Sequence, residues 1–257
     1  MCKSSIKVFI TVIVIFSICF SFTISSFAGN DNEIFFYDGT NIIQLTDNDH
    51  DDQQPQINNS GEVVWHGHDG NDDEVFYYDG TNITQLTDND HYDQHPQINN
   101  SGEVVWYGHD GNDNEIFFYD GTNIIQLTDN DYSDSAPQIN NSGEVVWRGY
   151  DLMNTEIFFY DGAATTQLTD NDYSDWSPQI NNNGMIVWNG YDRNDYEIFF
   201  YDGTNIIQLT DNDYDDVGQR VNDSGEVVWY SSILDPPGGG GGGGDGLLQN
   251  CCGSGGG

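Results

Sequence analysis

The chain has 257 residues with 43 acidic and five basic side chains, and both lysines lie in the first seven residues. A mature chain starting at residue 29 would keep three arginines against all 43 acids, a net charge of about −40. That charge excludes binding to nucleic-acid phosphates, which needs clustered Lys and Arg, and argues against docking on anionic lipid. Aromatic residues make up 14% of the chain, too many for an acidic disordered tail, so we expect one folded domain.

The two ends of the chain differ from its middle. Residues 1–28 are predicted to be a secretory signal peptide, with a basic start, the apolar run 8–22 and small residues before a cut after Ala28. An uncleaved anchor is the alternative, but the run is short for a bilayer span. Residues 233–257 are predicted to be a disordered Gly-rich tail, either an anchor or a truncation. We therefore expect an extracytoplasmic protein (secreted, periplasmic or on the cell surface) with no membrane insertion after cleavage.

Residues 29–232 form an internal repeat with a period of 41 residues. Five tryptophans keep this spacing from Trp65 to Trp229, and five glutamates keep it from Glu33 to Glu197. A fixed period of this length is typical of a solenoid, a propeller or an array.

Each unit is predicted to contain four short strands and no helix. In the second unit an Asn-Ser-Gly turn follows the first strand, and an Asp-Gly turn, a strong hairpin signal, follows the third. The predicted strands of that unit are 55–58, 62–66, 74–78 and 82–87.

The third strand of each unit is apolar at consecutive positions, as in Ile-Phe-Phe-Tyr, so both its faces need cover. A propeller blade between two neighbours provides that cover. The chain opens with the last two strands of a unit, in 33–46, and ends with the first two, in 220–230. The sequence therefore predicts an all-β propeller of five four-stranded blades, with the N-terminal two strands completing the last blade. A six-bladed ring lacking a blade, or a second copy supplying strands, is the alternative.

The motif L-T-D-N-D-Y-x-D-x-x-P-Q-I-N-N-S-G-E-V-V-W, followed by E-I-F-F-Y-D-G, resembles the TolB-like propeller repeat. The resemblance covers about residues 31–230. It implies an extracytoplasmic propeller that serves as a binding platform, in a family that usually builds six blades.

The loops that join one unit to the next share the pattern D-N-D-[H/Y]-x-D. Alternating Asp and Asn residues resemble the start of a calcium loop, but the later Glu and central Gly of such loops are missing. Calcium binding, solvated Asx-turns and adaptation to salt are therefore all open. The candidate metal ligands are Asp47, Asp49, Asp52, Asp88, Asp90, Asp93, Asp129, Asp131, Asp134, Asp170, Asp172, Asp175, Asp211, Asp213 and Asp216.

The position after each repeated Trp differs from unit to unit, and we interpret it as a candidate binding surface. A tolerant, half-exposed site is the alternative. A histidine metal site is disfavoured, because tyrosines occupy the same positions as several histidines in other units. The candidate binding residues are His66, Tyr107, Arg148, Asn189 and Tyr230.

An enzyme is not expected, because catalysis needs an asymmetric set of groups and nearly every carboxylate here recurs in several units. The first strands, which should line the channel of a propeller, carry no acid in their first four copies, and Asp223 in the last copy is the one departure. The leading hypothesis is a binding or scaffold module for protein or glycan partners, with calcium as the one cofactor considered. The alternative is a multivalent lectin with one sugar site in each blade. The sequence specifies neither the ligand nor the oligomeric state.

Overall fold

A computed structural model describes residues 31–232, and all regular structure in this part of the chain is β-strand. The predicted signal peptide, 1–28, and the predicted tail, 233–257, lie outside the described residues. No helix between residues 31 and 232 is long and apolar enough to cross a membrane.

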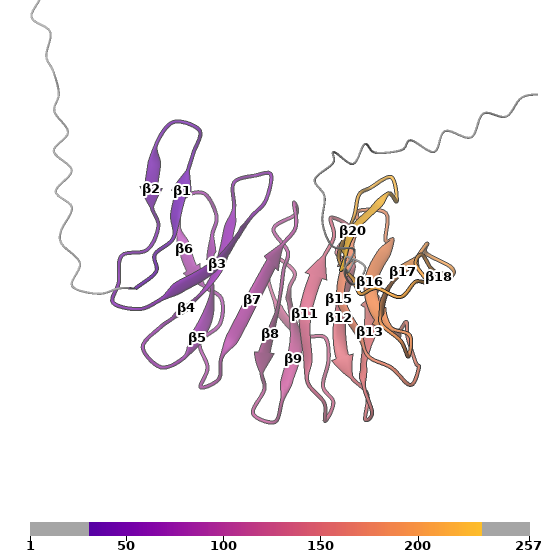
Figure 1. Cartoon of the computed structure of the whole chain (residues 1–257). Coiled ribbons are helices and arrows are strands. Elements are labelled where there is room, and N and C mark those ends of the chain that lie inside the picture. The colour runs from indigo at the N-terminus through magenta and orange to yellow at the C-terminus, as the bar shows by residue number, and fades with distance from the viewer. Residues whose placement is uncertain (1–30, 233–257) are drawn as a thin grey trace, which may run out of the picture. The chain divides into compact units, whose positions relative to one another are not determined.

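Four antiparallel sheets of four strands follow one another in chain order (Figure 1). The first contains β3 (Asp52–Ile57), β4 (Val63–His68), β5 (Asp73–Tyr78) and β6 (Ile83–Gln85). The second contains β7 (Asp93–Ile98), β8 (Val104–His109), β9 (Asn114–Tyr119) and β10 (Ile124–Gln126). The third contains β11 (Asp134–Ile139), β12 (Val145–Tyr150), β13 (Thr155–Tyr160) and β14 (Thr165–Gln167). The fourth contains β15 (Asp175–Ile180), β16 (Ile186–Tyr191), β17 (Tyr196–Tyr201) and β18 (Ile206–Gln208).

The prediction of four strands per unit is confirmed, with one systematic difference at the first strand. We expected this strand to begin at Pro55, but β3 begins at Asp52, which is paired with Gly67. The register shifts between Gln53 and Gln56, and Gln54 has φ of 53°. A bulge therefore lets the strand run through the proline and back to the acidic loop.

Apolar side chains cover both faces of the sheets, as the pattern predicted. Val63, Val64 and Trp65 are consecutive in β4 and at most 4% exposed. One face packs on the preceding sheet and the other on the following sheet: Trp147, for example, lies in one cluster with Val105 and Ile116 of the sheet before it. Each four-stranded sheet therefore depends on a neighbour on either side.

The tryptophan of each complete sheet is fixed in the same way. Trp147 stacks on Phe158 of the adjacent strand, with ring centroids 5.9 Å apart. Its Nε1 donates a hydrogen bond of 3.1 Å to Asp134, the first residue of β11. Trp65, Trp106 and Trp188 repeat both contacts with their own Phe and Asp.

A ladder of asparagines joins the units at the turn between their first two strands. The Nδ2 group of Asn140 donates to the carbonyl oxygen of Asn181, 41 residues later, at 3.0 Å. Its Oδ1 accepts the backbone N–H groups of Ser142 and Glu144. The same inter-unit bond runs from Asn58 to Asn99 and from Asn99 to Asn140. These bonds fix the spacing between units by polar contacts in addition to apolar packing.

The two ends of the described chain form separate half-sheets. The N-terminal half-sheet pairs β1 (Phe35–Tyr37) with β2 (Ile42–Gln44), and the C-terminal half-sheet pairs β19 (Asp216–Val221) with β20 (Val227–Ser231). No strand pairing joins these half-sheets within residues 31–232, so the expected closing blade is not formed in this structure. The structure thus establishes repeated four-stranded antiparallel sheets with a two-stranded half-sheet at either end of the described residues.

We predict that Asn140→Ala lowers the free energy of unfolding by about 1–3 kcal/mol, because buried backbone groups lose their hydrogen-bond partners. Denaturant unfolding followed by Trp fluorescence measures the change. Thr122→Ala, in an exposed turn of the preceding sheet, is the control and should stay within about 0.5 kcal/mol of the parent. Equal stability of the two variants would contradict a structural role for the asparagine ladder.

Candidate functional site

The positions at which the units differ lie opposite one another on the first two strands of each sheet. The five predicted binding residues each pair across the strands with a residue just before the bulge, and that position also varies, with Gln in two units and Ser, Trp or Val in the others. We call these pairs the variable row: Gln53–His66, Gln94–Tyr107, Ser135–Arg148, Trp176–Asn189 and Val217–Tyr230.

The bulge adds a third varying position to the row. Gln54, His95, Ala136 and Ser177 all have φ between 53° and 56°, and Gly218 has φ of 71°. This left-handed conformation is unusual for side chains other than glycine and is maintained in every unit. The bulge therefore directs a different side chain at the same place in each complete sheet, next to the acidic loops.

Aromatic side chains connect the variable row across the first two complete sheets. The ring of His95 lies 5.9 Å from that of His66 in the preceding sheet and 5.3 Å from that of Tyr107, stacked on both. Tyr107 donates its hydroxyl hydrogen to Gln94 at 3.1 Å. Burial lowers the pKa of His66 and of His95, and the positive charge of Arg148 lowers that of His95 further. Both shifts favour the neutral form of the ring.

Arg148 and Trp176 form a cation–π pair between the third and fourth sheets. The guanidinium carbon lies 4.7 Å from the centre of the Trp176 ring. The Nε of Arg148 donates to Ser135 at 3.0 Å, and the indole Nε1 of Trp176 is buried without an acceptor. These two side chains line an open cleft of about 490 Å³ together with Asp113 and Asp131. The cleft offers an aromatic ring and a cation, which suits a polar ligand with an acceptor group.

Three smaller clefts of about 400, 340 and 360 Å³ recur beside the acidic loops. The repeated Trp and its Phe partner line each one, together with an aromatic pair. The pair is His91–His109, Tyr132–Tyr150 or Tyr173–Tyr191, with centroids 5.1–6.1 Å apart. Tyr and His thus make the same contact, which agrees with the interpretation of these histidines as surface aromatics.

The acidic loops divide their aspartates between two environments. The third aspartate of each pattern, such as Asp93, is buried and accepts hydrogen bonds from the Trp indole and from the loop's Asn side chain. Burial raises the pKa of Asp93 and of Asp175, and it raises that of Asp134 to about 6. The first two aspartates, such as Asp88 and Asp90, are exposed. Among the described residues, no loop brings three of its predicted metal ligands within 4.8 Å of one another.

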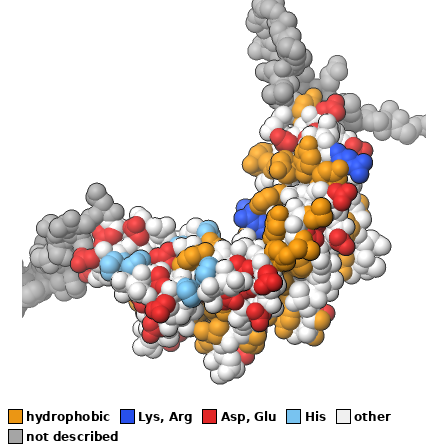
Figure 2. Space-filling model, turned by 90° about the horizontal axis from the view of Figure 1, so that it is seen from below, with side chains coloured by type: hydrophobic (Ala, Val, Ile, Leu, Met, Phe, Trp, Pro, Cys, Tyr) orange, Lys and Arg blue, Asp and Glu red, His pale blue; other side chains and the backbone are white. Residues whose placement is uncertain are grey.

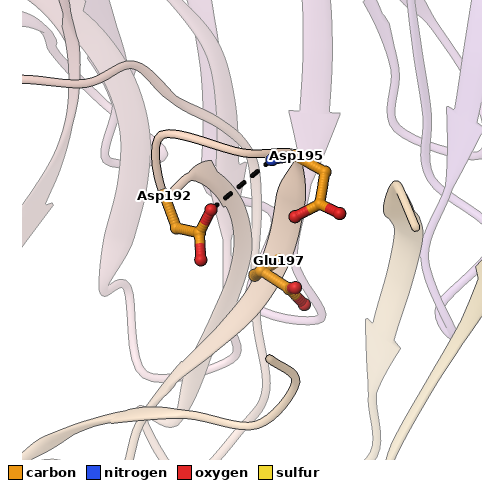
Figure 3. A group of neighbouring side chains, drawn as sticks. All are labelled: Asp192, Asp195 and Glu197. Atoms are coloured by element: carbon orange, nitrogen blue, oxygen red, sulfur yellow. Dashed lines mark hydrogen bonds between the residues drawn. The ribbon is translucent and has the colours of Figure 1, made fainter. Parts of the chain in front are cut away.

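A second set of carboxylates, which sequence reasoning did not select, lies at the start of the third strand. Glu74, Glu115 and Glu156 are fully buried, and desolvation raises the pKa of each to about 7. Among the described residues, one cluster of three carboxylates is compact enough to share an ion. It consists of Asp192, Asp195 and Glu197, with one oxygen from each within 4.8 Å of the others (Figure 3). The 41-residue spacing of the glutamates was visible in the sequence, but their burial was not.

Figure 2 shows one face of the molecule, on which Asp and Glu side chains are scattered and histidines gather in one part. All six histidines lie between residues 50 and 109. The surface charge is thus shared by the units, while the aromatic character of the face differs along the chain. Asp223, the acid singled out in the last unit, is exposed and accepts hydrogen bonds from Asn182, so it ends a second row of inter-unit bonds, in which each backbone N–H at this turn donates to the side chain 41 residues later.

Comparison with solved structures places these sheets among β-propellers. The chain is similar to the β-propeller domain of the Trilobed protease from Pyrococcus furiosus (14% identity, TM-score 0.50, covering 67% of this chain and 55% of that one). It is similar to TolB from Acinetobacter baumannii (12%, 0.50, 70% and 49%) and to the Porphyromonas gingivalis dipeptidyl peptidase 4 (14%, 0.54, 74% and 32%).

These likenesses, at such low identity, establish the fold alone. The chain matches about half or less of the length of these three structures. No protein-family model and no curated protein matches the sequence. The fold therefore defines a protein built from propeller-type blades.

We predict that Arg148→Met raises the pKa of His95, because a nearby positive charge that opposes protonation is removed. Titration of the His95 ring followed by NMR measures the shift. Arg193→Met is the matched control, because Arg193 stacks on Tyr173 in another part of the chain and should leave His95 unchanged. An unaltered His95 pKa in Arg148→Met would contradict the proximity of the two side chains.

Proposed function

We propose that this protein is an extracytoplasmic binding module, not an enzyme, whose partner docks on the variable row. The observation that carries the proposal is the distribution of differences between units. The scaffold residues (the Trp, its Asp and the ladder Asn) recur, while the residues of the variable row change from one unit to the next. Residues that differ at one structural position create an asymmetric surface on a symmetric frame, which suits one specific protein or glycan partner.

The Arg148–Trp176 cleft is the centre of the proposed surface. Arginine and tryptophan dominate binding energy at interfaces because they combine large contact areas with directed polar groups. Arg148 is also one of three basic residues in the mature chain, and Asp113 and Asp131 line the same cleft. A partner with both acceptor and donor groups, such as a polar glycan or a peptide segment, therefore fits better than a simple anion.

A multivalent lectin is the second candidate, and the three recurring clefts favour it. Their linings of an aromatic pair, a Phe and aspartate carboxylates resemble one another, so they would bind the same sugar at several places. The two proposals differ in whether one cleft or several similar clefts hold the ligand.

A glycan array and a displayed peptide library, probed with the labelled full chain, test the function. We predict a ligand whose affinity falls about ten-fold or more in Arg148→Ala and in Trp176→Ala, as expected for central interface residues. Thr122→Ala, in an exposed turn of the second complete sheet, is the control and should bind like the parent. A sugar that binds both variants at undiminished affinity would instead support the lectin, and catalytic turnover of a bound ligand would contradict a purely binding role.

We further infer that the two half-sheets pair to complete a fifth blade. The edge residues of the half-sheets are exposed, whereas their counterparts in the complete sheets are covered. Phe35 is 60% exposed and Trp229 36%, although the equivalent Trp147 is fully buried against Phe158. Applying the internal register places Trp229 opposite Phe35 and Val227 opposite Tyr37. The pairing would bury these side chains and satisfy two open strand edges.

A disulfide between positions 37 and 227 tests this closure. With the four native cysteines replaced by serine, Tyr37→Cys combined with Val227→Cys should form a bond within one chain, because paired strands bring Cα atoms within disulfide range. Non-reducing electrophoresis detects it as a monomer of increased mobility. Tyr37→Cys with Thr204→Cys is the control and should stay reduced. Disulfide-linked dimers alone would show that a second copy completes the blade.

A further inference from the structure

The start of the third strand carries an unusual pair of acidic residues in four of the five units. Each pair is an Asp and, two residues later, a Glu: Asp31–Glu33, Asp72–Glu74, Asp113–Glu115 and Asp195–Glu197. In every pair the Glu accepts a backbone N–H from the acidic loop at its Oε1, as Glu197 does from Asn212 at 2.7 Å. The other oxygen, Oε2, is buried without a partner, and so is one oxygen of each Asp. Buried carboxylate oxygens without partners are costly, so each pair lacks something that would satisfy it.

The fourth unit, which is the third complete sheet, shows what can satisfy the position of the Asp, although Oε2 of its Glu156 is also buried without a partner. It has Asn154 where the other units have Asp, and the Asn154 side chain is 8% exposed. Its Nδ2 group donates to Oε1 of Glu156 at 2.8 Å and to the carbonyl oxygens of Asn171 and Tyr173 at 2.7 and 2.8 Å. Three oxygens thus converge on one partly positive NH₂ group.

Where an Asp stands in place of Asn154, the NH₂ donor is lost, and the converging groups are all oxygens without a hydrogen to donate. In the fifth unit the counterparts are Asp195, Glu197 and the carbonyls of Asn212 and Tyr214, each 41 residues after its equivalent. Asp195 is 7% exposed and Glu197 fully buried, and each has an unpartnered oxygen. Asp192 adds a third carboxylate within 4.8 Å (Figure 3). A cation would meet the need that the Asn154 amide meets in the fourth unit.

We propose that Asp192, Asp195 and Glu197, with the carbonyl oxygens of Asn212 and Tyr214, bind one divalent cation, and that the Asn154 amide replaces this cation in the fourth unit. The ligand set consists of oxygens alone, from three carboxylates and two carbonyls on a loop. Calcium prefers such a set, because it takes six to eight oxygens in irregular geometry, whereas magnesium demands a strict octahedron. The absence of His and Cys from this group disfavours zinc and copper.

A shared proton is the competing explanation, since the Glu and Asp of a pair could hold one proton between them. Desolvation raises the pKa of Glu197 and of Asp195, which would favour protonation when no cation is bound. The two explanations differ in their response to added calcium, which stabilises the folded state only if it binds there.

The reciprocal variants Asp195→Asn and Asn154→Asp test the site in the full chain by calorimetric titration with Ca²⁺. Asp195→Asn installs the amide that already works in the fourth unit, so it should fold and bind one ion fewer than the parent. Asn154→Asp should bind one ion more. In thermal unfolding, Ca²⁺ should raise the parent midpoint by several degrees over a chelator at matched ionic strength, and this rise should shrink in Asp195→Asn.

Asp202→Asn is the matched control, because it removes one exposed carboxylate in the turn between β17 and β18 and should leave the number of bound ions unchanged. Equal calcium stoichiometry in the parent and Asp195→Asn would overturn the proposal. If Asp195→Asn does not fold, Asn154→Asp becomes the deciding variant, and an unchanged stoichiometry there would overturn the proposal equally. A parent protein that binds no calcium at millimolar concentration would favour the shared proton.

Discussion

Each sheet of this protein carries apolar side chains on both faces, so no sheet can be stable without neighbours. This constraint explains the repeat itself: a unit that buried one face would need one partner, whereas a unit with Val64 and Trp65 adjacent in β4 needs two. It also identifies the ends of the described chain as the places where the structure is incomplete. Trp229 keeps the sequence position of the buried tryptophans but is 36% exposed, because β20 has no third strand beside it.

Hydrogen bonds between polar groups fix the position of each Trp side chain and the spacing between neighbouring sheets. The Trp indole, its buried Asp and the loop Asn form one connected network in each complete sheet, and the asparagine ladder sets the distance to the next unit. Networks of this kind are stabilising only when every member has a partner. The asparagine ladder meets that condition. The Asp195–Glu197 pair does not, which is why a cation is proposed there.

The sequence predicted the architecture well because the signals for it repeat. Strand number, turn positions and double-sided burial followed from the 41-residue period and from Asp-Gly turns. The start of the first strand was placed too late, at Pro55. The bulge at Gln54 requires a left-handed backbone, and the residues at this position in the complete sheets are not glycine, which would have indicated it. The half-sheets stay unpaired in the structure, so strand count alone did not determine whether a ring closes.

The candidate site was predicted in part. The position after each Trp was identified from its variation, and the same signal would have revealed Trp176 and His95 had the first strand been placed correctly. The buried glutamates were missed for a physical reason: a carboxylate in an acidic sequence is expected at the surface, and only the packing shows that Glu197 lies beneath it. The sequence likewise does not show which loop aspartate is buried, because this depends on which of them accepts the hydrogen bond of the Trp indole.

Hydrogen exchange of the backbone amides in β20 tests the central claim, that a sheet of this protein requires strands and neighbours on both sides, most directly. If the half-sheets pair in solution, the amides of residues 227–231 should be protected nearly as well as those of residues 145–149 in β12, their counterparts in a complete sheet. Exchange in β20 as fast as in the exposed turn at residues 202–205 would contradict the account, because it would show that the last half-sheet remains open.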